Sequence, residues 1–443
     1  MIPVPSRRLL WAVAGLIPVA ALAGLLPVFW PVGVLGLAAV GLLAALDLLA
    51  GPRAADFPVV SAPPVTRIAR DRAAKIHLLV PANSGRLPRF RLALALPELI
   101  ASEQKVAEVV RSAAGRPVPV DWPCTGLRRG RWPIGPVCLE TDSPWGLWQL
   151  RRRQEIAAEV RVYPNLFSER RQLAALFLNR GQSGVTRRRI VGRGRDFERL
   201  REYQPGDSFD EVHWKATAKR GRPVTKVFQV ERTQEIYVVI DASRLSGRPV
   251  TVDGHAMTTL ERHLTAALVL LLAASRQGDR FGLVVHDARL RTFLRASNGA
   301  LHYGACREAV HAMEPSEVTP DFADLFATIR SRLRRRSLLF FLTDLSDPLV
   351  AEEFTRHVRL IARQHLVLVN QIGVPGAEPV FTRPVASDAE LYDRLAGHFQ
   401  WREARDIAAK LQPLGVTARL VANERLATEL VGQYLQVKGR QAL

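Results

Sequence analysis

The stretch EIYVVID (residues 235–241), with ASRLSG (242–247) behind it, decides the fold of the C-terminal half of the chain. It is a short run of mainly β-branched and aromatic residues that ends in Asp241. A nearly continuous apolar run bounded by turn-forming residues is typical of a strand buried on both faces of a parallel sheet. Asp241 is therefore expected at the carboxyl end of a strand, where it either binds a metal ion or only ends the strand.

Similar runs follow along the chain, at residues 280–287, 337–344, 365–372 and 416–422. Amphipathic helical patterns separate the runs, at residues 259–277, 322–335, 350–364 and 402–415. Strands that alternate with helices predict a Rossmann-like α/β domain over residues 235–443, with a mainly parallel sheet covered on both faces. Such sheets bind ligands at the carboxyl ends of their strands, where both Asp241 and Asp344 are expected.

Oxygen-bearing side chains at this edge suggest a site for a hard divalent cation such as Mg²⁺ or Mn²⁺. The arrangement resembles the MIDAS-like metal site of von Willebrand factor A domains, which combines a D-x-S-x-S loop, a threonine and a later aspartate. The residues that hold these positions here are Asp241, Ser243, Thr319 and Asp344. The predicted site is degenerate, because Leu245 stands where the loop requires its second serine.

The missing oxygen has two substitutes in the sequence. Ser246 lies one residue beyond Leu245 and serves only if the loop bulges, and Asp321 is an alternative donor close to Thr319. The competing interpretation needs no metal. Asp241 then caps the turn after its strand and Asp344 merely ends a strand, which are both common roles of aspartate.

The N-terminal residues 1–55 predict a transmembrane helical hairpin. No charged residue occurs between Leu9 and Leu46, and two apolar segments, 9–30 and 32–50, are each long enough to span a bilayer. Pro18 is tolerable inside the first span. Arginines flank both outer ends and the connecting turn has none, so two spans in a bacterial plasma membrane are expected, with the N-terminus and the bulk of the chain cytoplasmic.

Residues 60–166 show a different pattern, in which apolar residues recur at every second position. Examples are the stretches 76–80, 90–96 and 156–162, and prolines and glycines separate them. This period predicts a small antiparallel, β-sandwich-like domain. Nothing in it indicates catalysis.

The connector and signature segment, residues 167–234, carries the most specific pattern of the chain. A helical connector is expected over residues 166–181, and a capping box from Ser208 to Glu211 is expected to open a short helix. The segment resembles the Domain of Unknown Function 58 (DUF58) family, whose members pair R-x-Y-x-P-G-D and W-K-x-x-A motifs with an A-like domain. The matching residues here are Arg201, Tyr203, Pro205, Gly206, Asp207, Trp214, Lys215 and Ala218.

The resemblance implies a bacterial membrane protein that acts with a MoxR-type AAA+ ATPase in the assembly or maturation of client proteins. Two interpretations of the signature residues remain open. Arg201, Tyr203, Asp207, His213, Trp214 and Lys215 either form a surface that binds the partner or form an ion-pair lock over a buried Trp214. The lock is the favoured interpretation, because a packed tryptophan beside capping residues is a common structural combination.

Composition and short motifs narrow the classes of protein to which the chain can belong. The 443 residues predict two or three folded units, and the three cysteines fall in no C-x-x-C pair, which indicates neither a disulfide framework nor a zinc site. The sequence has no phosphate-binding G-x-x-x-x-G-K-[ST] loop, and no enzyme is expected. The alternatives are a metal-dependent enzyme that uses Asp241 and Asp344, or a basic protein, of net charge +20, that binds nucleic acid or anionic lipid. No specific nucleic-acid partner is expected.

Overall fold

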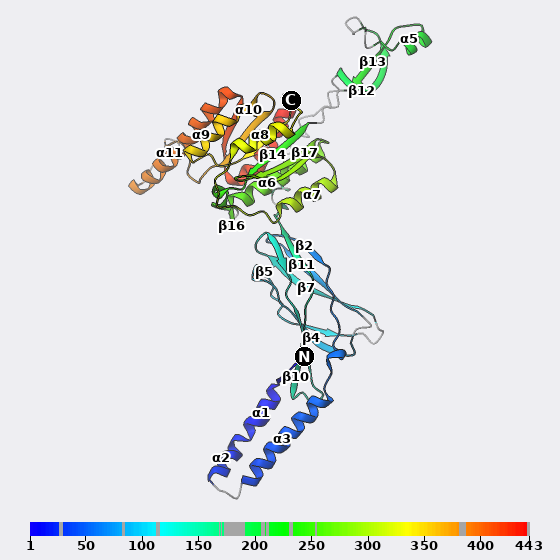
Figure 1. Cartoon of the computed structure of the whole chain (residues 1–443), viewed down its shortest axis with the longest axis vertical. Helices are drawn as coiled ribbons and strands as arrows, with labels where there is room; N and C mark the ends of the chain where they lie inside the picture. Colours follow the sequence, from blue (N-terminus) through cyan, green and yellow to red (C-terminus); the bar gives the residue numbers. More distant parts are fainter. Residues whose placement is uncertain are drawn as a thin grey trace. The chain divides into compact units, whose positions relative to one another are not determined.

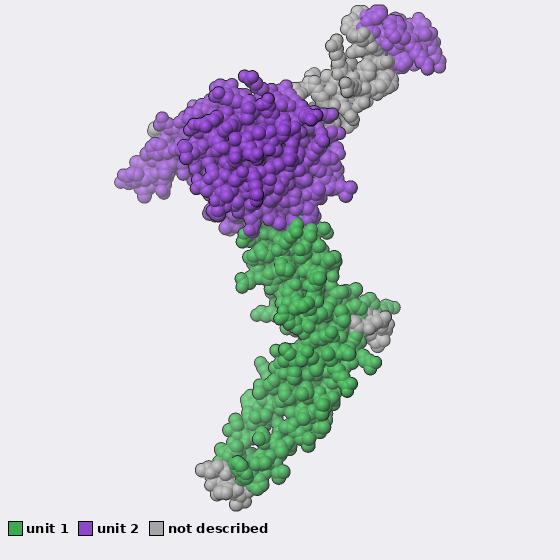
Figure 2. All heavy atoms as spheres, in the orientation of Figure 1, with its two compact units in different colours: residues 1–165 green, residues 166–443 purple. Residues whose placement is uncertain are grey.

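The computed structural model describes the chain except for residues 26–29, 82–84, 112–115, 168, 170, 172–190, 205–208, 210–211, 230–233, 253–254, 381–386 and 441–443. The chain folds into two compact units, residues 1–165 and 166–443, which are shown in green and purple in Figure 2.

The first unit begins with three helices, α1 (Arg7–Gly15), α2 (Ile17–Leu25) and α3 (Trp30–Ala50). Among the described residues, α3 alone is long and apolar enough to cross a membrane. The expected single helix from residue 9 to 30 is instead divided at Leu16 into α1 and α2 (Figure 1). Pro18 accounts for the break, because proline has no N–H to donate and its ring crowds the preceding turn.

A buried carboxylate ties α3 to the β-domain. Asp47, the only acidic residue of α3, is fully buried and accepts hydrogen bonds from Ser143 Oγ (2.5 Å), Trp145 N (2.8 Å) and Leu147 N (3.0 Å). One turn earlier, the carbonyl of Ala44 accepts a bond from Trp148 Nε1 (2.7 Å). The charge at the end of the apolar helix therefore fixes the turn between two strands of the β-domain.

The β-domain consists of three small sheets around one apolar core. Its strands are β1 (Ile2–Pro5), β2 (Val65–Ala69), β3 (Ala73–Val80), β4 (Arg89–Leu94), β5 (Ile100–Ala101), β6 (Ala107–Val110), β7 (Val118–Gly126), β8 (Gly130–Pro133), β9 (Val137–Asp142), β10 (Trp148–Gln154) and β11 (Glu159–Tyr163). The sheet orders are β1-β10-β9-β4-β6, β2-β11-β8 and β3-β7-β5.

Two features of this domain differ from the prediction. Strand β1 comes from the residues before the apolar helices and pairs antiparallel with β10. Strands β2 and β11 pair in parallel, so the domain is not purely antiparallel. The strands β3 to β10, which lie between β2 and β11 in the sequence, form the long connection that parallel pairing requires.

The second unit contains a six-stranded sheet in the order β18-β17-β14-β19-β20-β21. The strands are β14 (Glu235–Asp241), β17 (Arg280–His286), β18 (Leu290–Ser297), β19 (Leu338–Leu342), β20 (Leu366–Ile372) and β21 (Val416–Val421). All neighbouring pairs are parallel except β17 with β18. The predicted α/β domain with a mainly parallel sheet is confirmed.

Helices cover both faces of this sheet (Figure 1). The helices are α6 (Thr259–Arg276), α7 (Ala300–Val310), α8 (Phe322–Arg332), α9 (Pro348–His357), α10 (Arg359–Ala362), α11 (Asp388–Leu411) and α12 (Leu426–Arg440). Alternate residues of β14 point to opposite faces. Ile236, Val238 and Ile240 pack with α6, α7 and α12, whereas Tyr237 and Val239 pack with α8, α9 and α10.

The remaining described elements of this unit are two hairpins and a short helix. Strands β12 (Val191–Glu202) and β13 (Val224–Gln229) pair antiparallel and flank α5 (Trp214–Arg220). Strands β15 (Pro249–Val252) and β16 (His255–Thr258) form the second hairpin, after the 3₁₀ turn η4 (Arg244–Gly247). Apart from its first residues, the expected helical connector at 166–181 lies outside the described residues.

The Asp47 contacts lead to a first prediction. Replacing Asp47 with alanine leaves the Ser143 hydroxyl and the amides of Trp145 and Leu147 without their shared acceptor. We expect the first unit to lose about 1–3 kcal/mol of stability, because each buried donor then lacks a hydrogen-bond partner. Thermal unfolding of the detergent-purified chain measures the loss, and the exposed Glu103→Ala provides the control. Equal melting of both variants would show that Asp47 does not hold the two elements together.

Candidate interaction site at the sheet edge and the signature hairpin

Asp241 ends strand β14 and is almost completely buried. Its Oδ1 accepts a hydrogen bond from the amide of Ser243 (2.9 Å), and its Oδ2 accepts one from the Thr343 hydroxyl (2.7 Å). The first bond is the two-residue Asx turn that aspartate commonly forms after a strand. Both carboxylate oxygens therefore have donors from the protein itself.

The loop after Asp241 folds as the 3₁₀ turn η4 rather than as a bulge. Leu245 is buried within it, and the Ser246 hydroxyl donates to the carbonyl of Ser243 (2.7 Å). Ser246 is thus turned toward the loop backbone. The Ser243 hydroxyl is fully buried and has no hydrogen-bond partner among the described residues.

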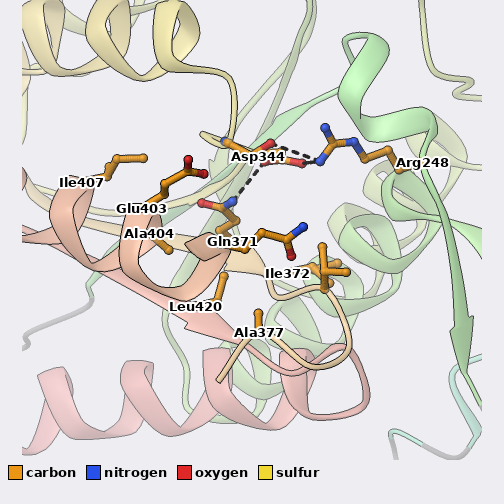
Figure 3. A pocket seen from close by; sticks show the side chains of 12 residues that line it. Arg248, Asp344, Gln371, Ile372, Ala377, Glu403, Ala404, Ile407 and Leu420 are labelled. Carbon is orange, nitrogen blue, oxygen red and sulfur yellow. Dashed lines mark hydrogen bonds and ion pairs between the residues drawn. The ribbon is translucent and has the colours of Figure 1, made fainter. Parts of the chain in front are cut away.

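Asp344 lies two residues beyond the end of β19 and is held by a cation of the protein. Arg248 Nη1 contacts Asp344 Oδ2 at 2.6 Å and Ser346 Oγ at 3.1 Å. Asp344 Oδ1 accepts from the amide of Ser346 (2.9 Å) and from Gln371 Nε2 (3.0 Å). Figure 3 shows Arg248 and Gln371 converging on this carboxylate, at the wall of a cavity of about 260 Å³.

The other predicted oxygen donors have separate roles. Thr319 is exposed, and Asp321 caps the N-terminus of α8 by accepting a hydrogen bond from the amide of Asp324 (2.9 Å). The structure therefore connects Asp241 with Ser243 and Thr343, and Asp344 with Arg248. Among the described residues, no hydrogen bond joins Asp241 to Asp344, Thr319 or Asp321.

These contacts test whether the residues fit a divalent cation. A cation would have to displace the Thr343 hydroxyl from Asp241 and the Arg248 guanidinium from Asp344. Hard cations bind free carboxylate and hydroxyl oxygens, and a neighbouring guanidinium repels them. No group of three or more His, Cys, Asp or Glu residues in the described part of the chain is arranged to hold a metal. The donor set in this arrangement does not fit the ion.

Two histidines that are not part of the predicted site lie near Asp241. His263 on α6 and His286 at the end of β17 are both fully buried. Burial lowers the pKa of His263 to about 4, although the negative charge of Asp241 acts in the opposite direction. Burial lowers the pKa of His286 as well, again against the charge of Asp241. Both imidazoles are therefore neutral at physiological pH.

The signature segment forms the β12–β13 hairpin with α5. His213 is the N-cap of α5, and its Nδ1 accepts the amide hydrogen of Ala216 (3.0 Å). Asp207, Ser208 and Glu211 lie outside the described residues. Arg201 is half-buried on β12, and Tyr203, directly after this strand, is exposed.

Within the described signature hairpin, Trp214 is not buried as the lock interpretation expects. Its side chain is 59% exposed, and its ring lies 5.5 Å from the ring of Phe209, which is 72% exposed. Lys215 is exposed beside it. A helix of seven residues that buries none of them offers no core behind which a tryptophan can pack. The described part of the signature presents an aromatic surface instead of covering one.

The site predicted from the sequence did not include Arg248, Gln371, Thr343 or the two buried histidines. Thr343 could have been predicted from the sequence, because it directly precedes Asp344 in the stretch FFLTD. Arg248 and Gln371 could not, since each meets Asp344 only through the tertiary fold.

The sheet order, the strand-end aspartate and the loop after β14 define an α/β domain with a von Willebrand A-like layout. Residues 199–377 match the family model described as "Protein of unknown function DUF58", which is the family that the motifs of the signature segment resemble. Uncharacterized proteins of Mycobacterium bovis and Mycobacterium tuberculosis are 26% identical over 212 residues, which are 47% of this chain. The match spans 63% of the length of these relatives.

Among solved structures, the chain matches the SpRpn10 VWA domain at 12% identity and a TM-score of 0.29, covering 45% of this chain and 95% of that one. The conserved hypothetical protein BatB from Bacteroides thetaiotaomicron is 14% identical with a TM-score of 0.30, covering 47% of this chain and 99% of that one.

The buried His263 leads to a prediction of pH dependence. Its folded-state pKa of about 4 lies below the value of 6.5 expected for the unfolded chain, so the unfolded state binds the proton more tightly. The second unit should keep its full stability above pH 6.5 and lose about 3 kcal/mol as the pH falls toward 4. Hydrogen–deuterium exchange of β14 as a function of pH measures this loss.

A leucine at position 263 removes one titrating group and should reduce the slope, leaving the part that other buried histidines such as His286 contribute. The control His357→Gln should keep the slope of the parent. A slope in His263→Leu as steep as that of the parent would assign the effect to other groups.

Proposed function

We propose that the protein is a membrane-anchored, non-enzymatic interaction module that binds a MoxR-type AAA+ ATPase in the assembly or maturation of client proteins. The observation that carries this proposal is the exposed aromatic pair Phe209 and Trp214 in the family signature. Large exposed aromatic residues beside cationic ones are the usual anchors of protein interfaces, and Lys215 and Arg220 accompany this pair on α5.

The partner class comes from the resemblance to the DUF58 family. The chain has no phosphate-binding loop of its own, so any dependence on ATP has to come from a partner. The hydrogen bonds to Asp241 and the Arg248–Asp344 ion pair support a structural role for the sheet edge, because both carboxylates already have partners within the protein.

Membrane anchoring is proposed for the helices α1 to α3. Their large apolar side chains are mostly exposed in the chain by itself, among them Trp11, Trp30, Leu35 and Leu42. Such a surface is typical of helices that face lipid. Arginines flank the two outer ends of the helices and the connecting turn has none, so we propose two spans in a bacterial plasma membrane, with the N-terminus, the β-domain and the second unit in the cytoplasm.

The test is recovery of the ATPase with the tagged chain from native membranes in the presence of ATP. Truncating both signature aromatics, Phe209→Ala and Trp214→Ala, should reduce recovery about tenfold or more, because interface anchors commonly contribute over 1 kcal/mol each. Thermal stability should stay close to that of the parent, since neither ring is buried.

The matched control is Leu301→Ala, which removes a 93% exposed apolar side chain from α7 and should leave recovery intact. Equal recovery with all three proteins, or an absence of any ATPase, would contradict the proposal.

A metal-dependent role that uses Asp241 and Asp344 is the second candidate, and the observation in its favour is the buried, unpartnered Ser243 hydroxyl beside Asp241. This candidate predicts heat of Mg²⁺ or Mn²⁺ binding that Asp241→Asn abolishes and Arg248→Ala strengthens, because the second change frees Asp344. Titration calorimetry of the purified chain measures it. Identical heats in the parent and both variants would exclude this candidate.

A further inference from the structure

A groove of about 810 Å³ lies beside the first turn of α1, within the first unit. It extends from residues 5–8 to β9, β10 and β4 of the β-domain, and its charged lining residues are Arg7, Arg8, Arg91, Glu140, Asp142 and Arg151. The proposed function does not use it.

Hydrogen bonds fix the wall of this groove where α1 starts. The Ser6 amide donates to the carbonyl of Leu147 (2.9 Å), and the Ser6 hydroxyl donates to the carbonyl of Gly146 (2.6 Å). Arg8 Nη1 donates to the carbonyl of Trp145 (3.4 Å). Together with the pairing of β1 and β10, these bonds hold the two arginines of the first helical turn beside the β9–β10 turn.

The charges in the groove do not cancel. Arg91 contacts both Glu140 (2.9 Å) and Asp142 (2.8 Å), and Arg151 contacts Glu140 (2.6 Å). Two strand arginines thus neutralise the two carboxylates. Among the described residues, neither Arg7 nor Arg8 forms an ion pair with a carboxylate, so two positive charges remain for a ligand.

The surface that continues from the groove is apolar. Leu10, which also lines it, is 56% exposed, and the next residue, Trp11, is 76% exposed. Every later residue of α1 and α2 is uncharged. A ligand that fits both parts has an anionic head and long apolar chains, whereas free phosphate or an acidic peptide satisfies the arginines alone.

We propose that this groove binds the headgroup of an anionic phospholipid, with its phosphate between Arg7 and Arg8 and its acyl chains against Leu10 and Trp11. Phosphate oxygens accept charge-assisted hydrogen bonds from guanidinium groups, and basic residues next to a membrane span favour anionic lipid. The site rests on the proposed membrane anchoring of α1 to α3, and it adds a lipid preference to that anchoring.

Native mass spectrometry of the detergent-purified full chain tests the site by counting bound phosphatidylglycerol and phosphatidylcholine. We expect a clear preference for phosphatidylglycerol, and a loss of about 10- to 30-fold in its affinity when Arg7 and Arg8 are both replaced by glutamine. The single variant Arg7→Gln, which removes no contact within the described residues, should lose part of the affinity with its fold intact.

The control Arg86→Gln with Arg116→Gln removes the same charge from exposed positions outside the groove and should keep the preference. An equal loss in the control would assign the preference to overall charge and overturn the site. Displacement of the lipid by excess inorganic phosphate would identify a site for free anions instead.

Alkaline extraction of membranes tests the anchoring separately. A chain that stays in the membrane but shows no lipid preference contradicts the groove alone, whereas a chain that is released contradicts the proposed anchoring.

Discussion

A carboxylate buried at the end of the central strand needs hydrogen-bond donors from the protein around it, and this requirement fixes the loops at the sheet edge. Asp241 accepts from the Ser243 amide and the Thr343 hydroxyl, which joins the loop after β14 to the end of β19. Leaving such a group without donors costs more than the bonds gain, so these two loops are fixed with respect to each other. The neutral side chains of His263 and His286 are also buried near Asp241.

The second aspartate of the predicted metal site, Asp344, is likewise held by a group of the protein. Arg248 supplies Asp344 with a permanent positive charge, where a divalent ion would supply one that can be removed. The contacts of Asp344 at this edge are therefore made by side chains and amides of the protein itself.

The strands and helices of residues 235–443 could be predicted because each buried strand is a continuous apolar run and each helix has an apolar stripe. Strand β18 could not, since LRTFLRAS alternates with arginines on an edge that is only partly buried. Nor could β1, with two prolines in four residues. Trp214 was expected to be buried because tryptophan is usually packed, and only the tertiary structure shows that α5 buries none of its residues. The aspartates of the site were found, but their partners lie about a hundred residues away in sequence.

Glu169 and Arg262 form a buried ion pair, and Arg262 also donates to the carbonyls of Asn423 (2.8 Å) and Glu424 (3.1 Å). The chain is thereby fastened to the α/β core near the start of the connector and signature segment (residues 167–234), and strand β14 of the core follows where that segment ends. Both ends of the segment are therefore held by the core. Because closure entropy grows only slowly with loop length, related chains are free to lengthen or shorten this loop at small thermodynamic cost. Evolution can thus vary the reach of the aromatic surface while the core that carries it stays the same.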